Sequence, residues 1–332
     1  MSPSGDWEDL AEGAAPWVPF APDAFAAFDT AAALVWQATD PSLAELARRR
    51  IATLLRNQPA VDRPPAAAPP LAEEKAAALP AWATSPLFDD TERACLAFTE
   101  QFVMDVGGMT PELVQPVLAH FGDRVGAFVQ ALFLLDVSQR MQMVLERIFD
   151  RPAGVGPPAR PGAGDVDLWG PIEDMLRVVA RLQALDPVTT ELVRLRGARQ
   201  HQCRICQSRL SLSALDAVGD RAVLDQVDRY EQSELPEREK VALRLTDAVI
   251  TQPSTVDEEL AAAVRRHFSP AETVEIVCDV ARNATNKVAV ALGADAAVVS
   301  DGVEYFDVDD RGEVVADVDP ANLRQLLGAG SG

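Results

Sequence analysis

Two cysteines separated by two residues, Cys203 and Cys206, have the clearest capacity for chemistry in this 332-residue chain. The surrounding sequence predicts a helix that ends near Gln200, a short break, and a second helix that starts near Cys203. Sulfurs three residues apart at a helix start lie on one face and can bridge, and the exposed N–H groups there stabilise a thiolate. A thiolate attacks peroxides and disulfides, and the second cysteine then closes an intramolecular disulfide. The motif therefore indicates thiol–disulfide exchange.

Two other interpretations of this C-x-x-C motif stay open, half of a zinc site and a pair of inert buried thiols. Zinc sites need about four ligands at suitable spacing, and the sequence contains neither a second C-x-x-C nor an H-x-x-x-H motif. The remaining cysteines, Cys95 and Cys278, are far away in the sequence and are expected to be small core residues. Redox chemistry is the favoured interpretation.

Positive charge close to the pair is expected to activate it. Lowering a thiol pKa from about 8.5 toward 7 raises the thiolate fraction at neutral pH by about an order of magnitude. Four arginines flank the cysteines in the sequence and could supply this charge: Arg196, Arg199, Arg204 and Arg209.

The chain as a whole is acidic, with 51 acidic and 30 basic residues and a net charge of -21. Such a surface repels phosphate backbones and anionic lipid, so neither nucleic acid nor a membrane is an expected partner. Four cysteines do not make a disulfide scaffold, and the N-terminus has no basic-then-apolar signal pattern. The longest apolar stretch, Val125 to Val137, is interrupted by Gln130 and is too short to cross a bilayer. These features predict a cytoplasmic protein.

Helical spacing of apolar residues dominates the sequence, which predicts an all-α fold. Helices are expected over residues 239–250, 259–268 and 272–292, with Ser269-Pro270 as a helix start. Proline and glycine dominate residues 151–165, which are predicted to be a linker. The segment after Ser300 is acidic, and residues 303–308 and 313–318 within it could form a small hairpin.

The chain also repeats itself. Glu239 lies 147 positions after Glu92, and the same shift aligns Leu96 with Leu243 and His120-Phe121 with His267-Phe268. We infer two tandem helical units packed as a pseudo-symmetric bundle, with a degenerate unit in residues 1–150, the linker in 151–165, the C-x-x-C unit in 166–300 and an acidic tail in 301–332. Further upstream a shift of 146 aligns Glu45-Leu46 with Glu191-Leu192. At that shift the first unit has Asn57 and Ala60 where the second has the cysteines, so it is expected to be chemically silent.

The sequence resembles the carboxymuconolactone decarboxylase superfamily, and within it the alkylhydroperoxidase D-like branch. The redox motif of that branch is a Glu, a Cys twelve positions later, x-x-Cys, and a His four residues beyond, and Glu191, Cys203 and Cys206 match its first three places. The stretches LPEREKVALRLTDAVI and HFSPAETVEIV are also similar to the family. The resemblance covers roughly residues 41–293 and implies peroxiredoxin-type activity, with a Glu and a His relaying protons to the cysteines.

This sequence departs from the family pattern at the histidine, because that place is Leu210. The position between the cysteines, which is His in some members, is Ile205. His201, two residues before Cys203, is a candidate substitute for the missing histidine. The alternative is that its side chain is solvated and has no catalytic role. Glu191 could still accept a proton, whereas its structural alternative is an ion pair with Arg194 or Arg196.

The sequence therefore predicts a thiol-dependent peroxidase or disulfide oxidoreductase that uses no metal or organic cofactor. The resemblance makes Cys206 the attacking residue and Cys203 the resolving one, whereas the helix-start argument alone favours Cys203. A hydroperoxide or disulfide substrate and a dithiol reductant are the expected partners, and the family implies a homo-oligomer. Two rival hypotheses are a non-redox lactone decarboxylase-like enzyme and a degenerate protein that binds a partner or assembles a complex.

Overall fold

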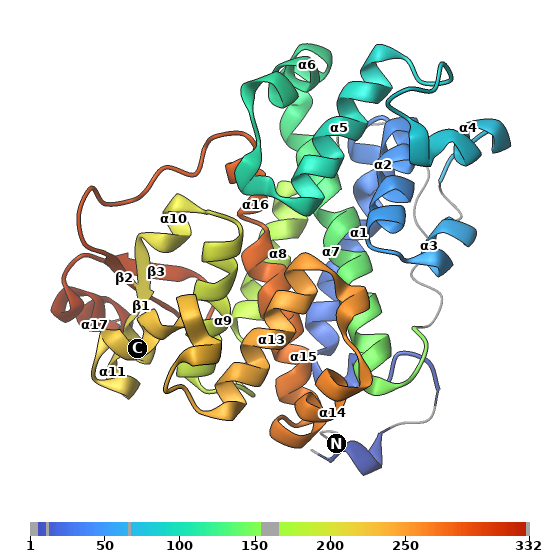
Figure 1. Ribbon diagram of the computed structural model, residues 1–332. Helices are drawn as coiled ribbons and strands as arrows, with labels where there is room; N and C mark the ends of the chain where they lie inside the picture. The colour runs from blue at the N-terminus through green and yellow to red at the C-terminus, as the bar shows by residue number, and fades with distance from the viewer. Residues whose placement is uncertain (1–5, 11–12, 66–67, 154–165, 330–332) are drawn as a thin grey trace.

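The computed structural model describes residues 6–10, 13–65, 68–153 and 166–329. Most of these residues are helical, and the few strands form a single small sheet at one edge of the molecule (Figure 1). The predicted all-α class is therefore confirmed. The predicted linker lies almost wholly outside the described residues, since residues 154–165 are not among them.

Seven α-helices lie in the described residues before the linker. Short 3-10 turns join several of them, and the long helix α7 runs through the middle of the molecule (Figure 1). The helices are α1 (Pro22–Ala38), α2 (Pro41–Leu54), α3 (Gln58–Asp62), α4 (Glu73–Ala78), α5 (Asp90–Met104), α6 (Pro111–Phe121) and α7 (Val125–Phe149).

The second half begins with another helix and ends with a hairpin and a helix. Its helices are α8 (Trp169–Ala180), α9 (Pro187–Gln200), α10 (Arg204–Gln207), α11 (Leu212–Val218), α12 (Arg221–Leu224), α13 (Glu237–Thr251), α14 (Glu258–His267), α15 (Pro270–Ala284), α16 (Lys287–Ala291) and α17 (Pro320–Ala329). Its strands are β1 (Arg209–Ser211), β2 (Glu304–Val308) and β3 (Val314–Asp317). Strands β2 and β3 pair in antiparallel fashion, so the predicted hairpin is confirmed.

The helix starts follow from local sequence chemistry. Asp186 precedes Pro187 and accepts hydrogen bonds from the backbone N–H groups at the start of α9, as Asp40 does for α2. Ser269 and Glu272 form a reciprocal capping box before α15, which confirms the predicted start. The prediction of a single helix over residues 272–292 is wrong in one respect. The observed helix α15 ends at Ala284, and a separate helix, α16, begins at Lys287.

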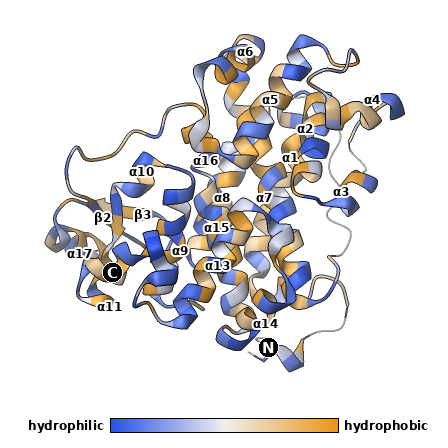
Figure 2. Cartoon of the chain, in the orientation of Figure 1, coloured by the Kyte–Doolittle hydropathy of each residue, from blue (hydrophilic) through white to orange (hydrophobic). Residues whose placement is uncertain are grey.

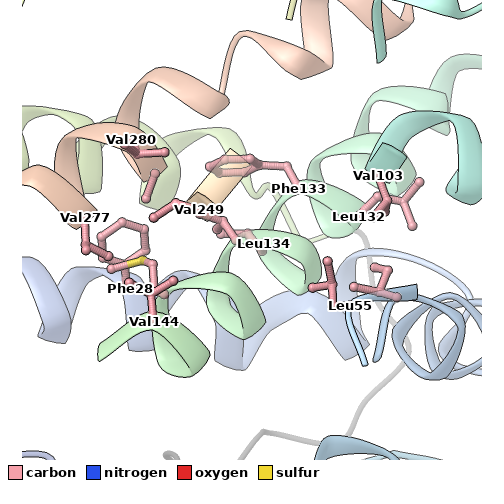
Figure 3. Close-up of a cluster of buried hydrophobic side chains, with 14 of the residues drawn as sticks. Phe28, Leu55, Val103, Leu132, Phe133, Leu134, Val144, Val249, Val277 and Val280 are labelled. Carbon is pink, nitrogen blue, oxygen red and sulfur yellow. The ribbon is translucent and has the colours of Figure 1, made fainter. Parts of the chain in front are cut away.

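One hydrophobic core joins the two halves of the chain. Its side chains come from α1, α2, α5 and α7 on one side and from α13 and α15 on the other, as the close-up in Figure 3 shows. The colouring in Figure 2 shows hydrophobic residues on the inner faces of the central helices and hydrophilic residues on outer turns, including those of α3 and α14. Burial of this shared apolar surface is the main term that holds the halves together.

Helices at matched sequence positions make matched contacts. Within the first half α2 packs on α5 and α7, and within the second half α9 packs on α13 and α15. Between the halves, α1 packs against α8 and α7 packs against α15. This arrangement is what a tandem pair would produce, and the duplication itself stays a prediction.

The stretch from Pro111 to Phe149 is, by length and composition, apolar enough to cross a bilayer. Its burial is uneven, because α6 buries only Val117, whereas α7 buries 15 of its 25 residues. The buried residues of α7 contact α1, α2 and α15, so α7 has the surroundings of a core helix. Composition alone is therefore weak evidence for a membrane span here.

Candidate functional site

Cys203 and Cys206 form a disulfide at the break between α9 and α10. Helix α9 ends at Gln200, as predicted, and Gln202 adopts a positive φ of 52° that turns the chain. Cys203 is the N-cap of α10, and its Sγ accepts a hydrogen bond from the backbone N–H of Cys206 at 3.2 Å. The turn therefore brings the two sulfurs together at the start of a four-residue helix.

The two sulfurs differ in their access to solvent. The side chain of Cys203 is 0 % exposed, whereas Cys206 is half-buried. Cys206 also lines a cavity of about 510 Å³, together with Ile205 and His201. An external molecule that enters this cavity meets Cys206 first.

The cavity walls come from several elements of the second half of the chain. Helices α8, α9, α15 and α16 supply one part, and β2 and β3 supply another. Strand β1, which directly follows the cysteine pair, pairs in parallel with β2, and this pairing brings the C-terminal hairpin to the site. The predicted acidic tail therefore contributes Phe306, Glu313 and Val314 to the cavity wall, which the sequence did not indicate.

Glu191 lies in α9 and forms an ion pair with Arg194. Its Oε2 accepts from Nε of Arg194 and its Oε1 from Nη2, both at 2.6 Å, and Oε1 also accepts from the backbone N–H of Ser211. Arg194 in turn donates Nη1 to the carbonyl of Cys206 at 2.8 Å. The carboxylate thus reaches the cysteine pair through Arg194, which favours a positioning role over direct proton transfer.

The first half contains a similar arrangement without cysteines, in which the glutamate has a second ion pair with Arg49. Glu45 pairs with Arg48, and Arg48 donates Nη1 to the carbonyl of Ala60 at 2.6 Å. Asn57 stands at the position of Cys203, and its Oδ1 accepts from the backbone N–H of Ala60. The residue before it, Arg56, has a positive φ of 58°. The glutamate–arginine pair therefore also forms where no thiol chemistry is available.

His201 is the last candidate that the sequence suggested. It is 7 % exposed and lines the cavity, so the solvated alternative is wrong. Burial, together with the charges of Lys287 and Arg140, lowers the pKa of His201 to about 3. The imidazole is therefore neutral at physiological pH, and so weak a base takes a proton from a thiol only with difficulty.

Leu210, at the place of the family histidine, belongs to β1 and is buried. It packs in a small second core with Leu192 and Leu243, and it does not line the cavity. The two remaining cysteines, Cys95 and Cys278, are buried core residues as predicted. Burial raises the pKa of both thiols, that of Cys95 to about 12.

The arginines near the cysteine pair do not supply the free positive charge that the sequence suggested. Each of the four forms an ion pair with a carboxylate that lies far away in the sequence. The strongest case is Arg204, which donates both side-chain and backbone hydrogen bonds to Asp295 and lowers the pKa of that carboxyl. The pairs are Arg196–Asp247, Arg199–Asp228, Arg204–Asp295 and Arg209–Glu304.

Three polar residues that line the cavity were not predicted to act there: Arg282, Asn283 and Thr285. They lie at the end of α15 and in the break before α16. The only sequence signal was a set of polar residues within an otherwise apolar helical run. Among the described residues, no group of three or more His, Cys, Asp or Glu side chains is arranged to hold a metal ion.

Fold and site together define an all-α protein with a disulfide-forming C-x-x-C pair beside a cavity. The chain is 40% identical over 228 residues to the uncharacterized proteins Rv2313c and MT2376 of Mycobacterium tuberculosis strains H37Rv and CDC 1551, and the match covers 68% of this chain and 80% of each relative. The chain belongs to the family of these mycobacterial proteins. No family model and no solved structure matches the chain, so the resemblance to alkylhydroperoxidase D-like proteins stays a prediction.

Proposed function

We propose that this protein is a thiol-dependent peroxidase or disulfide oxidoreductase whose reacting atoms are the sulfurs of Cys206 and Cys203. One observation carries the proposal. The two cysteines form a disulfide in which one sulfur is fully buried and the other lies in the wall of a cavity. Such a pair can receive a substrate at one sulfur and resolve the product with the other.

In the proposed reaction, the thiolate of Cys206 attacks the terminal oxygen of a hydroperoxide and breaks the O–O bond. Cys206 becomes a sulfenic acid, and the departing alkoxide takes a proton to become an alcohol. The thiolate of Cys203 then attacks the Cys206 sulfur, forms the disulfide and releases hydroxide, which leaves as water. The cysteine pair loses two electrons and the peroxide gains them.

A dithiol donor returns these electrons. Its thiolate attacks Cys206, the accessible sulfur, and Cys203 leaves as a thiolate. The backbone N–H of Cys206 donates to Cys203 Sγ and favours that leaving group. The second thiol of the donor then displaces Cys206, so the donor becomes a disulfide. The exposure of Cys206 to the cavity thus supports the assignment that the family resemblance implies. In that assignment Cys206 is the attacking residue and Cys203 is the resolving one.

Thiol trapping tests the proposal. We would treat the reduced protein with one equivalent of tert-butyl hydroperoxide, block free thiols at short times, and identify the modified peptides by mass spectrometry. We expect a Cys203–Cys206 disulfide that a dithiol reverses. The Cys203→Ser variant should accumulate a sulfenic acid on Cys206, whereas Cys206→Ser should leave Cys203 unmodified.

Cys95→Ser and Cys278→Ser are matched controls, since both thiols are buried in the core and we expect their removal to leave disulfide formation unchanged. Two thiols that do not react with peroxide or with an oxidised dithiol would contradict the proposal. A catalytic activity that survives in the double Cys→Ser variant would favour the non-redox decarboxylase-like alternative instead.

We also propose that the protein is cytoplasmic, because dithiol donors in the cytoplasm would keep such a cysteine pair reduced. Its proposed partners are a hydroperoxide or disulfide substrate and a dithiol reductant. By family resemblance we also propose a homo-oligomer, and light scattering that shows only monomer would contradict this part.

A further inference from the structure

One arginine in the cavity wall, Arg282, forms no ion pair within the described residues. Arg177, Arg194 and Arg209 line the cavity and each forms an ion pair, with Glu313, Glu191 and Glu304 respectively. Arg282 also lines it, yet makes no hydrogen bond or ion pair to any residue that the structure describes. A guanidinium stays protonated in proteins, so its charge faces the cavity.

Two further polar groups beside Arg282 also lack partners. The hydroxyl of Thr285 is buried, the residue being 6 % exposed, and it has no hydrogen-bond partner among the residues that the structure describes. The Asn283 side chain forms no hydrogen bond within the described part of the chain. Both residues line the cavity. Buried polar groups are normally paired, so the unpaired Thr285 hydroxyl, next to the partly buried Arg282 and Asn283 side chains, favours a polar ligand in this cavity.

One acidic group interacts electrostatically with Arg282 without forming an ion pair with it. Asp279, one helical turn before Arg282, is buried, and burial together with Glu275 raises its pKa, whereas the charge of Arg282 lowers it. Neither a hydrogen bond nor an ion pair joins Asp279 to Arg282 within the described residues. Glu173 and Glu313 also line the cavity, and both contact Arg177.

The rest of the cavity wall is largely apolar. It includes Leu176, Ile205, Val288, Leu292 and Phe306, and Cys206 lies in the same wall. A ligand that satisfies both parts of the cavity has an anionic end, a short hydrocarbon body and a group that reacts with sulfur. A carboxylate suits a guanidinium, a hydroxyl and an amide together, because it accepts several hydrogen bonds.

We infer that the cavity selects aliphatic hydroperoxides that carry a carboxylate, with Arg282, Thr285 and Asn283 holding the carboxylate while the peroxide reaches Cys206. This inference rests on the proposed function for the reaction, but carboxylate binding can be tested without it. The reaction is the one written above, in which the peroxide becomes an alcohol and the carboxylate is unchanged.

Binding to the oxidised protein is the first test. Isothermal titration calorimetry would compare octanoate with octanamide, which has the same chain but no charge. We expect octanoate to bind at least tenfold more tightly. Arg282→Leu should abolish this preference, Arg282→Lys should keep part of it, and Thr285→Val should weaken octanoate binding several-fold.

Arg266→Leu is the matched control, because Arg266 is an exposed arginine of α14 that does not line the cavity. It removes the same charge and should leave octanoate binding unchanged. Circular dichroism would show that each variant is folded. Equal affinity for octanoate and octanamide in the unmodified protein would overturn the inference, as would equal losses in the Arg282→Leu and Arg266→Leu variants.

Kinetics then separate the inference from the proposed function. The reduced protein would receive 6-hydroperoxyhexanoate or its methyl ester, and disulfide formation would be followed by thiol trapping. We expect the acid to react at least tenfold faster than the ester, and this ratio to fall toward one in Arg282→Leu. Fast oxidation by both peroxides at equal rates would overturn the inference and leave the proposed function intact. Octanoate binding that depends on Arg282, without oxidation by either peroxide, would support the anion site and contradict the peroxidase.

Discussion

Replacing Glu191 with Gln tests whether this residue relays protons to the cysteines or positions their backbone. Glu45 makes corresponding contacts in the first half, where no cysteine is present, so the Glu45→Gln variant is the reference. The two carboxylates are 2 % and 1 % exposed, and each accepts two hydrogen bonds from an arginine three residues later. In each half that arginine donates to a carbonyl twelve residues further on, that of Cys206 or of Ala60. Only the first of these carbonyls belongs to a cysteine.

The structure gives a magnitude for both variants. Removing one partner of a buried ion pair costs about 3–5 kcal/mol, because the other charge stays buried and unpaired. Glutamine keeps part of the hydrogen bonding, so we expect Glu191→Gln and Glu45→Gln each to lower the free energy of unfolding by about 3 kcal/mol. Urea denaturation followed by circular dichroism measures both.

Oxidation kinetics give the decisive comparison. If Glu191 acts through Arg194 on the Cys206 backbone, Glu191→Gln should slow disulfide formation less than about tenfold, without changing its pH profile. Loss of general acid–base catalysis typically costs about 10²–10⁴-fold. A hundredfold loss in Glu191→Gln, with a shifted pH profile and a normal rate in Glu45→Gln, would refute the positioning role and restore the relay.

Three further predictions concern stability. Because the pKa of Asp279 is raised, its stabilising contribution is fully present below about pH 4 and is lost as pH rises through about 8. At pH 9 the Asp279→Asn variant should therefore be more stable than the unmodified protein, by on the order of 2 kcal/mol in urea denaturation. Equal pH dependence of stability in the two proteins would contradict this prediction. Leu210→His, which introduces the histidine of the pattern that the sequence resembles, should destabilise the protein by about 2 kcal/mol without faster oxidation of the cysteine pair by peroxide, because position 210 packs in the second core. Phe306→Ala should cost about 3 kcal/mol in thermal or urea unfolding, since the ring is buried in β2 and lies 5.0 Å from the Arg194 guanidinium; a loss below about 1 kcal/mol would show that the hairpin is not held by this contact.

Features encoded by neighbouring residues could be predicted from the sequence. The end of the helix at Gln200 and the start of α15 at Ser269-Pro270 follow from capping chemistry within a few residues. The hairpin formed by β2 and β3 also follows from local alternation around a turn. The break between α15 and α16 was missed because α16 resumes after only two residues, Thr285 and Asn286, so the apolar spacing hides the interruption.

Features that depend on distant residues could not be predicted. The partner of Arg204 is Asp295, 91 positions away, so the sequence suggested a free cation where the structure has an ion pair. The parallel pairing of β1 with β2 joins residues separated by more than 90 positions, and it makes Leu210 part of a strand. Helical periodicity carries no information about either contact. For the same reason Arg282 could not be connected with Cys206.

The pairing of β1 with β2 also has a consequence for the order of events during synthesis. The cysteine pair leaves the ribosome long before the hairpin that closes its cavity, because β1 starts at Arg209 and β3 ends at Asp317. During that interval the cavity wall lacks Phe306, Glu313 and Val314, which β2, β3 and the turn between them supply. The selection proposed for the finished cavity can therefore begin only once the hairpin has docked.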